Sequence, residues 1–178
     1  MVASAVKLLS TQDLTDLTVR AITEEADVGY GTFYLHFSDR DDIVWEIISS
    51  ILDQTNELMN QQVSSLPFPQ REFARLRIFF DFVSKNQTQF LTVLGEGSSP
   101  TLAYRYRNAI AEMTHKNFQD NNYQSDLTDV PLEIVANFYS GAMLRLATWW
   151  IENKNDFSAE QMAQMVYKMV FPNSELPF

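Results

Sequence analysis

The fold is decided by residues 17–44, which read LTVRAITEEADVGYGTFYLHFSDRDDIV. Thr18 is the predicted N-cap of a helix over 19–26, because its hydroxyl can accept a hydrogen bond from a free amide of the first turn. A three-residue break at 27–29 leads into a brief helix over 30–36. Two short helices joined by a tight turn are typical of a helix-turn-helix.

A long helix is predicted next, with Asp39 as its N-cap and two further aspartates in the first turn, where the helix dipole favours negative charge. It should run over 39–64, about 39 Å at 1.5 Å per residue. The residues expected on its buried side are Ile43, Ile47, Ile51, Leu58 and Val63. This helix should link an N-terminal domain of residues 1–48 to a second domain of residues 49–178.

The rest of the chain has helical periodicity and lacks the alternation of strands. The five glycines and six prolines fall mostly between apolar segments, where helices are interrupted. The helices expected from these signals cover residues 2–10, 19–26, 30–36, 39–64, 70–84, 86–94, 99–120, 132–153 and 158–171. The predicted fold is therefore all-α, with about nine helices and no sheet.

The composition limits the class of protein. The 178 residues are 46% apolar, which suffices for one substantial core or two small ones. The chain has no cysteine, so disulfides and cysteine-ligated metal sites are excluded. It also has no apolar run of spanning length and no secretion signal at its start, so we expect a cytoplasmic protein without a membrane partner.

The charge is strongly acidic, with a formal net charge of −10. Residues 1–50 contain three basic and nine acidic side chains. Taken alone, this balance argues against a nucleic-acid partner, because binding to phosphates normally depends on clustered basic residues.

Residues able to perform catalysis are scarce. The chain has two histidines, and it lacks a Gly-rich phosphate loop or a nucleophile elbow. Glu112 and His115 share a helical face, but a second such pair, which a di-metal site in a bundle needs, is missing. We therefore expect no enzyme activity, no metal and no cofactor.

Several linked segments carry a resemblance to a known family: Thr18-Val19-Arg20, Gly31-Thr32-Phe33-Tyr34, and His36-Phe37 followed by a capped long helix. Over residues 2–48 the chain closely resembles the N-terminal domain of the TetR/AcrR family of ligand-responsive repressors. The resemblance implies an N-terminal three-helix DNA-binding domain and a C-terminal helical bundle that binds a ligand and dimerises.

The short helix over 30–36 should offer its outer surface to a DNA major groove, with Phe33 and Phe37 anchored inward. The family resemblance adds Arg20 as a base or phosphate contact, and Thr18 and Arg40 as backbone contacts. The complete set of expected DNA-binding residues is Thr18, Arg20, Tyr30, Gly31, Thr32, Tyr34, His36 and Arg40. For each of them a purely structural role, as a cap or as a solvated side chain, is the alternative.

The second domain is rich in aromatic and thioether side chains, some of which could line a ligand cavity. The expected ligand-pocket residues are Phe79, Phe82, Phe90, Tyr104, Met113, Tyr139, Met143 and Trp149. The alternative is that these side chains simply fill the core, and nothing in the sequence fixes the charge of a ligand.

The last two helices resemble the pair through which family members dimerise. The residues expected at the dimer interface are Ala142, Leu146, Trp150, Met162, Met165, Val166 and Met169, although some must pack within the protomer. A two-fold dimer would place two recognition helices about one turn of DNA apart, roughly 34–36 Å.

These features together predict a TetR-like regulator, a repressor that binds a palindromic double-stranded DNA operator as a homodimer and is released by a small molecule. The alternative is a TetR-fold module that binds a ligand or a protein and has weak or lost DNA binding. The acidic N-terminal region motivates this alternative.

Overall fold

The computed structural model describes residues 1–67, 70–120, 129–153 and 156–171. Within these ranges the chain is all-α and contains no strand, which confirms the predicted fold class. The elements are α1 (Val2–Leu9), the 3₁₀ turn η1 (Leu14–Asp16), α2 (Val19–Glu25), α3 (Tyr30–His36), α4 (Arg40–Val63), α5 (Gln70–Lys85), α6 (Gln87–Leu94), α7 (Pro100–Asp120), α8 (Leu132–Glu152) and α9 (Ala159–Val170). Each predicted helix is present, and its ends lie within about one residue of the prediction.

The predicted caps hold the helix-turn-helix together. The Thr18 hydroxyl accepts a hydrogen bond from the Ala21 amide at 3.1 Å, and Asp39 accepts one from the Asp42 amide at 2.9 Å. Between α2 and α3 the chain turns at Asp27, whose φ of 51° lies in the left-handed region that aspartate tolerates better than most residues. The local chemistry read from the sequence therefore fixes both helix starts.

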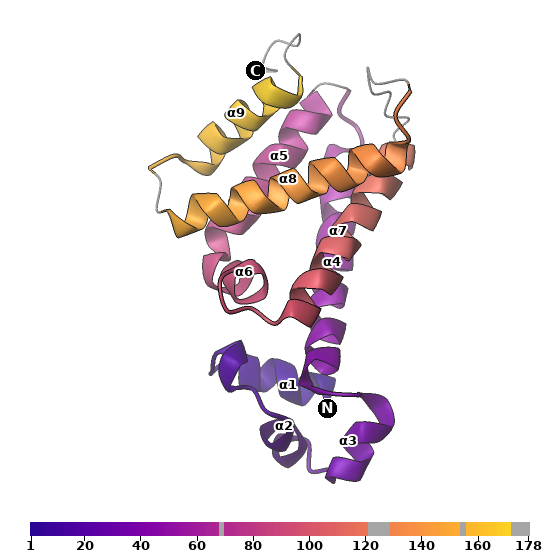
Figure 1. Cartoon of the computed structure of the whole chain (residues 1–178), viewed down its shortest axis with the longest axis vertical. Helices are drawn as coiled ribbons and strands as arrows, with labels where there is room; N and C mark the ends of the chain where they lie inside the picture. Colours follow the sequence, from indigo (N-terminus) through magenta and orange to yellow (C-terminus); the bar gives the residue numbers. More distant parts are fainter. Residues whose placement is uncertain (68–69, 121–128, 154–155, 172–178) are drawn as a thin grey trace.

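The molecule is elongated, with α1, α2 and α3 gathered at one end (Figure 1). Helix α4 leads from this end into a larger group of helices, and α7 runs beside it. Helix α8 packs across α7, while α9 packs on α5. None of the helices within the described residues is both long enough and apolar enough to cross a membrane.

Two apolar clusters hold the helices, and we call them the small core and the large core. The small core comprises Ala5, Leu17, Ile22, Phe33, Ile43, Val44 and Leu102. The large core is built from α4 to α9. Leu102 is the one contribution of α7 to the small core, and Trp45 and Ile48 of α4 pack against both cores. The division into domains at residue 48 stays a prediction.

The expected buried side of α4 is partly wrong. Ile43 and Val63 are buried, but Ile51 and Leu58 are exposed, and Leu52 is buried instead. Ile43 and Leu52 lie nine residues apart, which places them about 180° apart around the helix. The helix therefore has two apolar faces, one for each core, and the sequence prediction assumed a single stripe.

Candidate functional site

The outer surface of α3 is the first candidate site. Phe33 is buried in the small core and Phe37 packs beside it, as predicted. The remaining residues of α3 are exposed: Tyr30, Gly31, Thr32, Tyr34, Leu35 and His36. Tyr34 is 56% exposed and Leu35 is 82% exposed. A compact aromatic and polar surface therefore projects from the end of the molecule.

The three Lys and Arg side chains of residues 1–50 are all ion-paired within the chain. The pairs are Lys7–Glu25, Arg20–Glu24 and Arg40–Asp41. In the second of these the Arg20 Nε lies 2.8 Å from Glu24, and hydrogen bonding to this carboxylate raises the pKa of Arg20 above its ordinary value. Arg20 is nevertheless well exposed, so its guanidinium is accessible to a second partner.

Thr18 and Arg40 stand at the starts of α2 and α4. The Thr18 hydroxyl is engaged as a cap but remains exposed, whereas Arg40 is half-buried and donates to Asp41 from both Nε and Nη2. Thr18 thus lies at a surface that a phosphate can approach. Arg40 would have to leave Asp41 in order to contact one.

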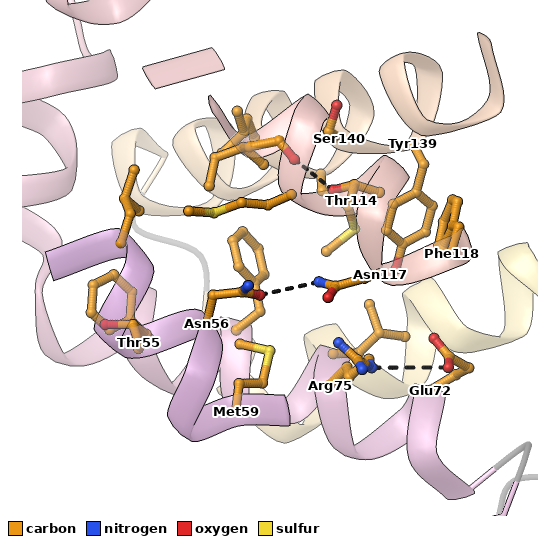
Figure 2. A pocket seen from close by; sticks show the side chains of 18 of the residues that line it. Thr55, Asn56, Met59, Glu72, Arg75, Thr114, Asn117, Phe118, Tyr139 and Ser140 are labelled. Atoms are coloured by element: carbon orange, nitrogen blue, oxygen red, sulfur yellow. Dashed lines mark hydrogen bonds and ion pairs between the residues drawn. The ribbon is translucent and has the colours of Figure 1, made fainter. Parts of the chain in front are cut away.

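The second candidate site is a cavity of about 170 Å³ lined by residues of α4, α5, α7 and α8. Figure 2 shows its lining side chains converging from these helices. Five of the predicted pocket residues lie on its wall: Phe79, Phe82, Met113, Tyr139 and Met143. The other walls carry further apolar groups, such as Leu52, Met59 and Ile110.

Three predicted pocket residues lie elsewhere. Phe90 is buried in the large core, with its ring edge-on to Tyr106 at 6.3 Å. Tyr104 and Trp149 are exposed. On α7 the cavity side is defined by Tyr106, and Tyr104, two residues earlier, points about 200° away around the helix.

The sequence analysis missed an amide network across the cavity. Asn117 of α7 donates to Asn56 of α4 at 3.1 Å and accepts from Asn60 at 3.1 Å. Figure 2 shows the Asn56–Asn117 bond running through the middle of the pocket. Two asparagines four residues apart in a helix, a residue type that helices disfavour, were the available signal.

The sequence analysis also missed the charged side chains of the cavity, which we call the arginine cluster. It consists of Arg71, Glu72 and Arg75 in the first two turns of α5. Glu72 Oε1 lies 3.2 Å from Arg71 Nε and 4.0 Å from Arg75 Nε. All three side chains are between 14% and 18% exposed. Burial is the main cause that lowers the pKa of Arg75 from its ordinary value, and Glu72 opposes this effect.

Comparison with known families decides the class of the protein. Residues 2–47 match the family described as "Bacterial regulatory proteins, tetR family", and residues 74–172 match the one described as "Transcriptional regulator C-terminal region". The chain belongs to the TetR family of transcriptional regulators. This confirms the resemblance found in the sequence.

Two curated relatives, both described as HTH-type transcriptional regulators, match over part of their length. The transcriptional regulator HbdR of Aromatoleum sp. (strain CIB) is 32% identical over 69 residues, which are 39% of this chain and 30% of HbdR. An uncharacterized HTH-type transcriptional regulator of Haemophilus influenzae is 26% identical over 100 residues, 56% of this chain and 49% of that protein. The matched part thus spans 30% to 49% of the length of these relatives.

Solved structures agree over nearly the whole chain. A putative TetR-family regulator from Syntrophomonas wolfei has a TM-score of 0.66 at 18% identity, covering 94% of this chain and 89% of that one. FadR from Bacillus subtilis, in complex with stearoyl-CoA, has a TM-score of 0.63 at 15% identity, covering 98% and 97%. At these identities the likeness establishes the TetR fold.

In this TetR-family protein, α7 joins the cavity to the helix-turn-helix. Near its start, Arg105 Nη1 lies 2.7 Å from Asp42 Oδ1 of α4, and the Ser99 hydroxyl donates to Asp41. Leu102, between them, is 1% exposed in the small core. The pKa of Asp42 is lowered below its usual range, mainly by the hydrogen bond from the Ser38 amide and secondly by Arg105. We call this contact the α4–α7 junction.

The predicted interface residues on α8 and α9 separate into two groups. Trp150, Met162 and Val166 are buried within the protomer, and Leu146 packs against the large core. For Trp150, Met162 and Val166 the predicted interface position is wrong, because these side chains already fill this chain's own core. Leu146 is half-buried, and its place at an interface stays a prediction. Ala142, Met165 and Met169 are exposed, together with two apolar neighbours on α8 that were not predicted, Ile134 and Phe138.

Proposed function

We propose that this TetR-family regulator binds a palindromic operator as a homodimer, represses transcription, and leaves the DNA when a small molecule occupies the cavity. The observation that carries this proposal is the α4–α7 junction. Helix α7 contributes Met113 and Asn117 to the cavity and Leu102 to the small core that supports α3. A ligand that displaces α7 therefore acts on the position of the recognition helix.

The outer surface of α3 is the proposed DNA contact. Thr32 offers a methyl group and a hydroxyl to base edges, and Tyr34 and His36 can donate to phosphate oxygens. Gly31 permits close approach of the backbone, since a Cβ built there has no protein atom within 4 Å. Thr18, Arg20, Tyr30 and Arg40 complete the proposed contact set.

The exposed apolar face of α8 and α9 is the proposed dimer interface. Phe138 is 79% exposed, and Ile134 and Ala142 continue the same face of α8. Met165 and Met169 lie one turn apart on α9. Exposed apolar side chains in this number on two consecutive helices favour burial against a second copy. The cavity wall supplies the proposed ligand site, with Phe79, Phe82, Met113, Tyr139 and Met143.

Structural relatives support a small-molecule ligand for this fold. FadR from Bacillus subtilis is described in complex with stearoyl-CoA. We propose that the present cavity, lined by residues of α4, α5, α7 and α8, also takes an effector. A regulator of this kind acts on chromosomal DNA, so we assign it to the cytoplasm and expect no enzymatic activity.

The experiment is a binding titration of the purified protein with the promoter fragment beside its own gene, followed by fluorescence anisotropy at low salt. We expect a specific complex of one dimer per palindrome. Gly31→Leu should weaken it at least tenfold while leaving thermal unfolding unchanged or improved, because leucine is the better helix former and the Cβ position of residue 31 faces open space. Absence of a specific complex at low salt would contradict the proposal.

A second function is favoured by the ion pairing of the basic residues. Lys7, Arg20 and Arg40 each hold an acidic neighbour, so DNA phosphates must compete for them. This observation suits a TetR-fold module that binds a ligand or a protein and has little affinity for DNA. The two candidates differ in the salt dependence of DNA binding. An operator-binding dimer has six such residues, so a plot of the logarithm of its DNA-binding constant against the logarithm of salt concentration should have a slope no steeper than about −5.

A further inference from the structure

The cavity differs chemically from one side to the other, and this asymmetry bears on which ligand it takes. Most of its wall is apolar, with Phe79, Met113 and Met143 among the lining side chains. The charged side chains among its described lining residues all belong to the arginine cluster. In Figure 2, Arg75 and Glu72 lie together at one side of the pocket, below Tyr139.

The arginine cluster carries an excess of positive charge. It contains two guanidinium groups and one carboxylate. Arg71 Nε donates a hydrogen bond to Glu72 at 3.2 Å, whereas Arg75 Nε lies 4.0 Å from the same oxygen, beyond hydrogen-bond range. Glu72 is thus committed chiefly to Arg71, and Arg75 is compensated only at a distance.

The partial burial of the arginine cluster makes this imbalance costly. A buried cation is stable when it is paired and hydrogen-bonded, and each of these three side chains is at least four-fifths buried. The lowered pKa of Arg75 has the same cause, since burial outweighs the stabilisation that Glu72 provides. An anion entering the cavity would give Arg75 a closer partner than Glu72, whose Oε1 lies 4.0 Å from its Nε.

We propose that the effector is a small amphiphilic monoanion, an inference that rests on the proposed function of the cavity as the ligand site. Its carboxylate would bind Arg75, with Arg71 nearby, and its hydrocarbon or aromatic body would lie against Phe79, Met113 and Met143. Carboxylates match the planar guanidinium fork, which can hold both oxygens. A cationic head would be repelled by two guanidinium groups, and a neutral head would leave the excess charge unpaired.

The volume of the cavity limits the body of the ligand. An apolar cavity of about 150 Å³ holds a benzene molecule, and this one measures about 170 Å³. The body that fits without rearrangement is therefore one aromatic ring or a chain of about six to eight carbon atoms. Longer chains would extend beyond the cavity or require α7 or α8 to move.

Three probes that share one tail and differ in the head group test the proposal. Octanoate, 1-octanol and octylamine are titrated separately into the full-length protein by isothermal titration calorimetry. We expect octanoate to bind at least tenfold more tightly than 1-octanol, and octylamine to bind most weakly. Equal or tighter binding of 1-octanol or octylamine would overturn the proposal.

Two arginine variants on the same helix locate the head group. Arg75→Gln should lose at least tenfold in octanoate affinity and change 1-octanol affinity less than threefold. Arg77→Gln is the matched control, because Arg77 is exposed on α5 and does not line the cavity. Equal losses in the two variants would overturn the assignment. If Arg75→Gln fails to fold, the comparison of head groups in the wild-type protein still decides.

The proposed function and this inference fail in different ways. If octanoate binds through Arg75 but leaves operator affinity unchanged, the ligand class stands and release by the cavity's occupant is wrong. If 1-octanol releases the operator as effectively as octanoate does, the regulatory mechanism stands and the anionic head is wrong.

Discussion

The two ends of α4 are held by different physical means. At the first turns, Ile43 and Val44 are buried in the small core, and Asp42 is ion-paired with Arg105 of α7. In the second half of the helix, Asn56 and Asn60 contact α7 through amide hydrogen bonds beside a cavity. One end is fixed by close packing and charge, whereas at the other end the contact with α7 includes neutral amide hydrogen bonds beside a cavity.

This difference indicates how a change at the cavity would reach the recognition helix α3. A region with few packed neighbours deforms at low cost, so a ligand is accommodated at the cavity end. The packed end moves as a unit with α3, because interdigitated side chains transmit displacement rather than absorb it. Helix α7 parallels this arrangement, with Asn117 at the cavity and Leu102 in the small core.

The largest effect is expected for Leu102→Ala. The leucine is almost fully buried between α7 and the helix-turn-helix, so its truncation should lower the free energy of unfolding by about 2–4 kcal/mol. Urea denaturation measures this loss. Tyr104→Ala, two residues away and 66% exposed, should change it by less than about 0.5 kcal/mol. Similar losses for both variants would show that Leu102 does not anchor α7.

The helix-turn-helix and its caps were predictable because they depend on local chemistry. Thr18 and Asp39 each cap within three residues of themselves, and the inward direction of Phe33 follows from helical spacing alone. The two faces of α4 were not predictable, since they depend on which helices lie on either side. Ile51 and Leu52 are both large and apolar, so the sequence alone does not tell which of them is buried in the core.

The candidate sites followed the same division. On α3, outward residues follow from the direction of one anchored side chain. The wall of the cavity is formed by residues from four helices. On each helix, a side chain that lines the cavity is only one position away from one that lies in the core or in solvent. Phe90 and Trp149 were misplaced for this reason, and Trp150 was assigned to an interface although it donates its indole N–H to Phe157 within the protomer.

The next largest effect concerns the coupling between the ends. Arg105→Gln removes the ion pair of the α4–α7 junction but lies outside the cavity wall. We expect the variant still to bind the effector, but the effector should change operator affinity less than it does in the wild type. The coupling free energy between two such sites is typically about 1–3 kcal/mol, and the variant should lose part of it. Anisotropy titrations with and without octanoate measure this. Arg107→Gln, exposed on the same helix, is the control. An unchanged response in Arg105→Gln would exclude the junction as the route.

A smaller loss is expected at the cavity end. Asn60→Ala removes the hydrogen bond to Asn117, and should lower the free energy of unfolding by about 0.5–1.5 kcal/mol. Gln61→Ala, exposed on the same turn, should have an effect below about 0.5 kcal/mol. A loss at Asn60 as large as that of Leu102→Ala would contradict the contrast between the two ends.

The smallest effect is the pH dependence at the packed end. The Ser38 amide and Arg105 both favour the Asp42 carboxylate, so its pKa in the folded protein is lower than in the unfolded chain. The stability it contributes is then present above the ordinary aspartate pKa of about 4, and is lost as the pH falls through the lowered value. Because both partners are partly solvated, the contribution should stay below about 1 kcal/mol.

The unfolding temperatures of the wild type and Asp42→Asn should therefore differ most near pH 7 and converge as the pH falls well below the ordinary aspartate pKa of about 4. A difference between the two proteins that does not narrow as the pH falls would show that the pH-sensitive charge at this end of the helix is not Asp42.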